Sequence, residues 1–158
     1  MNTNIYDFRL RGADMPMLVS FEETCADCQR LEHVYMQSNK FSRTHKVSMK
    51  GMFRDCPNLL DISFKDSDMY GVRDVSFLFK NCKSLETIDF SGCRLSNLDL
   101  ASGLFYNCTN LFSVELHPAF LGCNDIKGMF YNCPAGEAYR DKLPSEAFKP
   151  LGDLGDDL

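Results

Sequence analysis

Three lines of this sequence are nearly the same, and a fourth begins in the same way. They are GMFRDCPNLLDISF from Gly51, FLFKNCKSLETIDF from Phe77, GLFYNCTNLFSVEL from Gly103 and GMFYNCPAG from Gly128. The corresponding cysteines lie 26, 26 and 25 residues apart, by subtraction of their numbers: Cys56, Cys82, Cys108 and Cys133. A fixed period of this length is typical of a repeat architecture, in which each unit stacks on the next.

A degraded unit precedes these lines. The stretch TCADCQRLEHVYM over 24–36 aligns with MFRDCPNLLDISF over 52–64, and Cys25 then occupies the position that a phenylalanine holds in the later units. The pair Cys25-x-x-Cys28 is therefore interpreted as part of the repeat rather than as a redox motif. A zinc site on this pair would need two further ligands nearby, and His33 is expected to project from a strand, so we predict no metal site.

Each unit divides at its cysteine. The residues after the cysteine alternate between apolar and polar, as in 59–64, which predicts a short strand with one buried face. The apolar residues before it recur at roughly helical spacing in 72–81 and 124–132, which predicts a short helix packed on the strands. The residue just before each cysteine tolerates the turn or left-handed conformation that would end such a helix. These residues are Asp27, Asp55, Asn81, Asn107 and Asn132.

Stacking such units predicts an α/β repeat solenoid, because no single unit buries its apolar face alone. We expect four to five rungs of about 26 residues, with parallel strands on one face and short helices on the other. The expected division is an N-terminal cap over 1–20, the solenoid over 21–133, and a C-terminal cap and acidic tail over 134–158. Four apolar residues are expected to cover the last rung: Tyr139, Leu143, Phe148 and Leu151.

The recurring line Met-Phe-x-x-Cys-x-x-Leu-x-x-Ile resembles the BspA-type leucine-rich repeat, which is found in bacterial surface proteins. The matching residues of one unit are Met52, Phe53, Cys56, Leu59 and Ile62, and the match recurs in register over about 24–133. The return loops KDSDMYGVRDV and SGCRLSNLDL depart from the family's Ser-x-Phe-Asp-Thr-Ser stretch. The resemblance implies a leucine-rich-repeat solenoid used for adhesion or protein recognition, and it brings no catalytic residues.

The repeat also determines how the cysteines are interpreted. Neighbouring parallel strands lie about 4.8 Å apart, whereas the Cβ atoms of a disulfide lie about 3.5–4.5 Å apart. We therefore predict a ladder of reduced, buried thiols. Its members are Cys28, Cys56, Cys82, Cys108 and Cys133. Cys93 and Cys123 lie in return loops, where we expect them to be more exposed.

No catalytic pattern is evident. The three histidines lie in different units, and the sequence has neither a Gly-rich phosphate loop nor a His-Glu-x-x-His motif, so we predict a non-enzyme without a cofactor. The net charge of −5 argues against nucleic acid as the main partner. No apolar run approaches the roughly 18 residues of a membrane span, and no basic-then-apolar start is present, so we expect a cytoplasmic protein. A surface or secreted location is the alternative if the sequence is part of a longer precursor.

The outward positions of the strands are the first candidate site. Between the buried residues, each strand sends two side chains outward: His33 and Tyr35, Asp61 and Ser63, Thr87 and Asp89, Ser113 and Glu115. Side by side, they predict a polar face with an acidic stripe and an aromatic ring at one end. We interpret this face as a docking surface for a partner protein with a basic surface, the alternative being an ordinary solvated sheet.

A second candidate surface lies on the expected helix side, where basic residues alternate with tyrosines. Its residues are Arg54, Lys80, Lys83 and Tyr106. Such a pattern can contact phosphates and stack on bases, which makes nucleic-acid binding the alternative function. An ordinary charged surface is the simpler interpretation. A structural subunit or a protein inhibitor is a further alternative, since a compact domain without visible chemistry suits either role.

Overall fold

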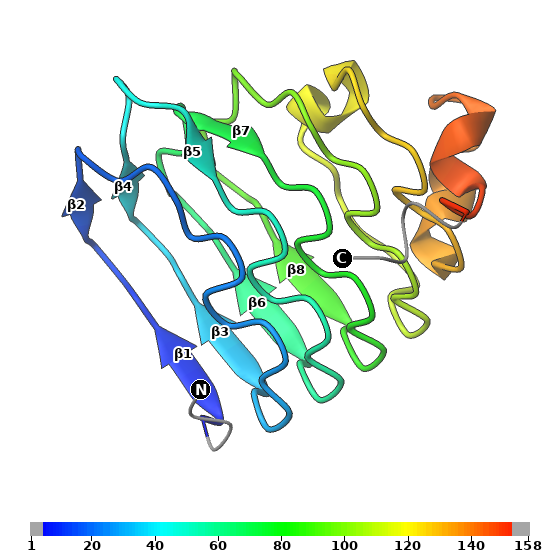
Figure 1. The fold of residues 1–158 in the computed structure, drawn as a ribbon, viewed down its shortest axis with the longest axis horizontal. Helices are drawn as coiled ribbons and strands as arrows, with labels where there is room; N and C mark the ends of the chain where they lie inside the picture. The colour runs from blue at the N-terminus through cyan, green and yellow to red at the C-terminus, as the bar shows by residue number, and fades with distance from the viewer. Residues whose placement is uncertain (1–4, 153–158) are drawn as a thin grey trace.

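The computed structural model describes residues 5–152, and its strands stack in parallel as successive turns of a solenoid (Figure 1). One four-stranded sheet, called here the main sheet, has the order β1-β3-β6-β8. Its strands are β1 (Asp7–Arg9), β3 (His33–Tyr35), β6 (Asp61–Ser63) and β8 (Thr87–Asp89). Four stacked strands delimit about three turns, fewer than the four to five rungs expected from the repeat.

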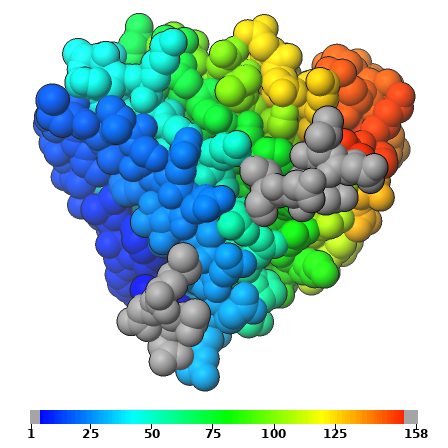
Figure 2. Space-filling view, viewed as in Figure 1, coloured from blue at the N-terminus to red at the C-terminus, as the bar shows by residue number. Residues whose placement is uncertain are grey.

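Two shorter sheets form the other sides of the turns. β2 (Asp14–Met15) pairs with β4 (Lys40–Phe41), and β5 (Val47–Ser48) pairs with β7 (Val72–Asp74), both in parallel. Isolated parallel bridges extend both pairs along the stack, as far as Arg94 on one side and Asp125 on the other. Three 3-10 helices follow: η1 (Pro118–Gly122), η2 (Pro134–Tyr139) and η3 (Ser145–Phe148). Order along the chain is therefore order along the stack, as the colours of Figure 2 show.

The repeated phenylalanines form the centre of the core. Phe53, Phe79, Phe105 and Phe130 stack in a row, with ring centroids 6.2, 6.0 and 5.2 Å apart, and all four side chains are buried. A fully buried phenylalanine side chain contributes roughly 1.5–3 kcal/mol. The 26-residue period is thus the length of chain that returns one phenylalanine to lie on the next.

The short helices expected before the cysteines are absent from the described part of the chain, so the α/β prediction was wrong and the solenoid is built of strands and turns. The segment from Val72 begins as strand β7 and continues as turns. Alternate amides, those of Gly51, Phe53 and Asp55, donate to carbonyls of the next turn at 2.9, 3.1 and 2.7 Å. An α-helix would use these N–H groups within itself. Winding the chain as a solenoid directs them to the neighbouring turn instead.

The left-handed residue before each cysteine was predicted correctly. The φ angles are 58°, 57°, 61°, 61° and 53° for Asp27, Asp55, Asn81, Asn107 and Asn132. This backbone aligns the side chains along the stack. The amide nitrogens of Asn81, Asn107 and Asn132 donate to the preceding Asp55, Asn81 and Asn107 side chains at 2.7, 2.9 and 3.1 Å. A short amide side chain that accepts and donates is therefore suited to every turn.

The cysteines form the predicted series of free thiols. The thiols of Cys56, Cys82 and Cys108 each donate to a carbonyl of the preceding turn, at 3.1, 3.0 and 3.1 Å. Burial raises the pKa of Cys82 to about 12, so its thiol stays protonated and weakly reactive. The expectation for Cys93 was wrong: it is buried, because its thiol donates inward to the Phe64 carbonyl at 2.9 Å. Cys123 is half-buried.

Aromatic side chains cover the C-terminal end of the core. The rings of Tyr139 and Phe148 stack on Phe130, with centroids 5.5 and 6.2 Å away, and Leu143 is buried. Leu151 lies against the backbone of Gly128. At the other end, β1 and β2 pair into sheets as a first turn. The acidic residues of the expected tail lie outside the described residues, and the domain boundaries stay predictions.

Candidate functional site

The register of the main sheet gathers six of the eight residues predicted for the docking face. Alternate residues of a strand share one face, and the parallel pairing aligns them from strand to strand. One column consists of Asp7, His33, Asp61 and Thr87, and the other of Arg9, Tyr35, Ser63 and Asp89. Their side chains are half-buried or exposed. The sequence thus predicted both columns correctly over β3, β6 and β8.

Tyr35 is the centre of the N-terminal half of this face. The guanidinium carbons of Arg9 and Arg11 lie 4.7 and 5.2 Å from the centroid of its ring. The ring of His33 stacks beside it at 6.3 Å, and Nδ1 of His33 lies 2.7 Å from Oδ2 of Asp61. Cation–π contacts and stacking hold the phenol in one place.

Sequence reasoning missed the two arginines because residues 1–20 were assigned to a cap. The signal was present in the stretch Asp7-Phe8-Arg9, which has the same polar-apolar-polar alternation as His33-Val34-Tyr35. Asp7 accepts a hydrogen bond from Arg9 at 3.0 Å, which offsets part of the positive charge at this end.

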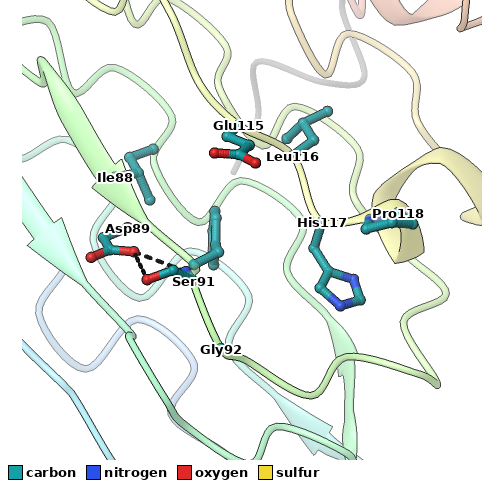
Figure 3. A pocket seen from close by; sticks show the side chains of 9 residues that line it. Ile88, Asp89, Ser91, Gly92, Glu115, Leu116, His117 and Pro118 are labelled. Carbon is teal, nitrogen blue, oxygen red and sulfur yellow. Dashed lines mark hydrogen bonds between the residues drawn. The ribbon is translucent and has the colours of Figure 1, made fainter.

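The C-terminal half of the face is acidic. Asp89 accepts hydrogen bonds from the hydroxyl and the backbone N–H of Ser91, at 2.6 and 2.8 Å (Figure 3). These bonds lower the pKa of Asp89, so its carboxylate is ionised at neutral pH. The remaining two predicted residues, Ser113 and Glu115, are exposed but lie on no strand. The strand expected over 111–116 is not formed.

The main sheet opens where that strand was expected. Between β6 and β8, the N–H of Glu86 donates to Leu60 and the N–H of Phe64 donates to Asp89, both at 2.9 Å. Among the described residues, segment 112–116 makes no such bond with β8. Two adjoining hollows of about 270 and 430 Å³ occupy the interval, and Ile88 and Glu115 line both. We call the space between 86–92 and 113–118 the slot. Figure 3 shows the side chains that line the smaller of the two hollows.

The peptide groups of the last turn are used elsewhere, which explains the opening. The hydroxyl of Tyr139 donates to the Val114 carbonyl at 2.7 Å and accepts from the Leu116 N–H at 3.1 Å. Pro118 has no N–H, and the amide of Phe120 donates to the carbonyl of His117, the residue before η1, at 3.0 Å. The short apolar-polar alternation of 111–116 did not reveal these competing partners.

The alternative surface predicted for nucleic acid is largely covered. The side chain of Arg54 is 15 % exposed and bonds to Glu23 and Asp55. Burial lowers the pKa of Arg54, but these hydrogen bonds outweigh it and raise the pKa overall. Lys80 and Tyr106 are 6 % and 5 % exposed, which leaves Lys83 as the one exposed member of the set.

Comparison with family models, with curated proteins and with solved structures gave no match. Within residues 5–152, no three His, Cys, Asp or Glu side chains are grouped so as to hold a metal ion. None of the helices in the same part of the chain has the length and apolar character needed to cross a membrane.

Proposed function

We propose that this protein binds a partner protein through the outward face of the main sheet and performs no catalysis itself. The observation that supports this most strongly is the Tyr35 ring, held by Arg9, Arg11 and His33 in the N-terminal half of an ordered polar face. Tyrosine and arginine dominate the energetics of many interfaces. A ring that is already ordered loses little conformational entropy on binding.

The face is electrostatically polarised along the stack. Arg9 and Arg11 lie at the N-terminal end, whereas Asp89 and Glu115 lie toward the C-terminal end. A partner with a basic patch opposite the acidic end, as the sequence suggested, would be oriented by this asymmetry. We further propose that the chain is a short BspA-like leucine-rich repeat protein of the cytoplasm, on the strength of the repeated core line.

The test is capture of a partner from nuclease-treated lysate of the source cell by three immobilised proteins. The first is the wild type, and the second carries Asp61→Lys, Asp89→Lys and Glu115→Lys. The matched control carries Glu22→Lys, Asp141→Lys and Glu146→Lys, three exposed acids outside the main sheet with the same change in charge. We expect the control to retain a stoichiometric protein partner and the sheet variant to retain at least 10-fold less.

A single uncharged substitution in the N-terminal half of the face tests the contribution of the aromatic ring separately from that of the acidic side chains. Tyr35→Ala removes the ordered ring and is expected to weaken the same complex about 30-fold, the equivalent of a hot-spot loss of about 2 kcal/mol. Equal capture by all four proteins would contradict the proposal. Capture of nucleic acid alone, before nuclease treatment, would contradict it as well and would favour the Lys83 side.

A further inference from the structure

We propose that the slot binds an extended peptide segment that alternates basic and apolar side chains and adds to β8 as a further strand. This inference rests on the proposed function, because it assigns a partner chemistry and a binding mode to the C-terminal end of the same face. The observations that support it are an unpaired strand edge, an acidic border and an apolar floor.

The unpaired edge follows from the hydrogen bonds of the preceding turn. In a parallel pair, alternate residues direct both their N–H and C=O groups toward one neighbour. Thr87 and Asp89 are bonded to β6, since the Thr87 N–H donates to Leu60 and the Asp89 carbonyl accepts from Phe64. The peptide groups of Ile88 and the N–H of Phe90 therefore face the slot. An exposed edge of this kind is a template for β-strand addition.

The opposite wall is held back. Tyr139 occupies both the Val114 carbonyl and the Leu116 N–H, so segment 113–116 is anchored to the C-terminal end of the molecule and not to β8. Among the described residues, β8 makes no backbone hydrogen bond to this segment. An incoming strand thus gains hydrogen bonds without displacing an existing partner.

The charge of the residues that border the slot indicates which side chains a bound peptide would carry. Glu86, Asp89 and Glu115 lie along it, and no lysine or arginine is among its lining residues. The carboxylates of Asp89 and Glu115 come from opposite walls (Figure 3). Ile88 and Val114 are half-buried between them. A strand with alternating lysine or arginine and apolar residues complements both features, since its side chains alternate between two faces.

The experiment uses amide hydrogen exchange, measured by NMR on the ¹⁵N-labelled full chain. Without peptide, we expect the amides of Ile88 and Phe90 to exchange at least 100-fold faster than those of Ile62 and Phe64, their counterparts on β6. The probe is the capped peptide Lys-Val-Lys-Val-Lys. At saturation it is expected to slow exchange at Ile88 and Phe90 at least 10-fold. A capped Glu-Val-Glu-Val-Glu peptide and a fully N-methylated basic peptide are expected to give no protection.

Variants assign the effect to the slot. Glu115→Lys is expected to weaken binding of the basic peptide at least 10-fold, whereas Glu146→Lys, an exposed acid on η3, is expected to leave it unchanged. Protection that arises elsewhere, or protection that survives full N-methylation, would overturn the inference, as would the absence of protection at millimolar peptide.

Failure of this inference is distinguishable from failure of the proposed function. Tyr35 lies on β3 and does not line the slot. Loss of the captured partner in Tyr35→Ala, together with absent peptide protection, would keep the docking face and reject the slot. The docking face would be rejected if the peptide protected the amides but neither Tyr35→Ala nor the sheet variant reduced capture of the partner.

Discussion

The two sides of the last turn differ sharply. On the side of the cysteines, the ladder of backbone bonds continues to the end: Phe79 donates to Leu104 at 3.1 Å, and Phe105 donates to Met129 at 2.8 Å. On the side of the main sheet, the ladder stops at β8 and the slot begins. Stacking is therefore maintained by one side of the solenoid while the other side is open.

This difference shows that the two halves of the repeat contribute unequally to the stacking of the turns. The half before and around each cysteine contains the phenylalanine row, the amide ladder and the thiol bonds, all of which repeat from turn to turn. The half after the cysteine is held by a three-residue strand and by fewer repeated contacts, such as the stacking of Phe64 on Phe90 with ring centroids 5.6 Å apart. A local competitor such as Tyr139 is sufficient to separate one strand there without disrupting the core.

The largest expected effect on stability comes from a substitution on the side of the cysteines, where the backbone ladder is continuous. Phe79→Ala removes a fully buried ring between Phe53 and Phe105 and is expected to lower the free energy of unfolding by about 3–5 kcal/mol. Phe112→Ala in the opened segment removes a ring that is 72 % exposed and should change it by less than about 0.5 kcal/mol. Urea denaturation measures both. A Phe79→Ala loss below about 1 kcal/mol would contradict the stacked core.

Two isoleucines of the main sheet allow a direct comparison between a strand that is paired on both sides and β8, which borders the slot. Ile62 and Ile88 are aligned in neighbouring strands, yet Ile62 is 2 % exposed and Ile88 is only half-buried. Ile62→Ala is expected to cost about 2–5 kcal/mol of unfolding free energy, and Ile88→Ala less than half as much. Thermal and urea unfolding of the two variants give the comparison. Equal losses would mean that the slot is closed in solution.

The smallest effect concerns pH and the thiols of the closed side. Burial raises the pKa of Cys82 from 9.0 to about 12. The unfolded chain therefore loses this proton first, so the stability contributed by the protonated thiol is complete below pH 9 and declines above it. The decline is about 1.4 kcal/mol per pH unit for each such thiol until the folded pKa is reached.

Replacing the thiol tests this assignment. Cys82→Ala is expected to make the fall in unfolding free energy between pH 9 and 11 shallower by about 1.4 kcal/mol per pH unit. Leu85→Ala, which removes a buried apolar side chain from the same turn, should lower the whole curve in parallel. An unchanged slope in Cys82→Ala would show that this thiol is solvated in the folded protein.

Several features of the fold were predictable because they depend on one unit and its copies. The spacing of the cysteines predicted the stack, and the aspartate or asparagine before each cysteine predicted a left-handed residue. The period-2 alternation predicted the outward columns from His33 to Asp89. The helices were wrong because i, i+3 and i+7 spacing also suits a series of turns whose alternate amides bond to the next unit.

The sequence by itself determined the repeat, the phenylalanine and cysteine rows of the core, and the outward columns of β3, β6 and β8, since each follows from a local periodicity that recurs along the chain. Only the tertiary structure decided where the stack opens. The slot depends on a competition between β8 and Tyr139 for the peptide groups of 113–116, and on an η1 segment that bonds to itself. Tyr139 lies 25 residues from Val114 along the chain. No local pattern contains that contact, because it exists only once the C-terminal segment has folded back over the last turn.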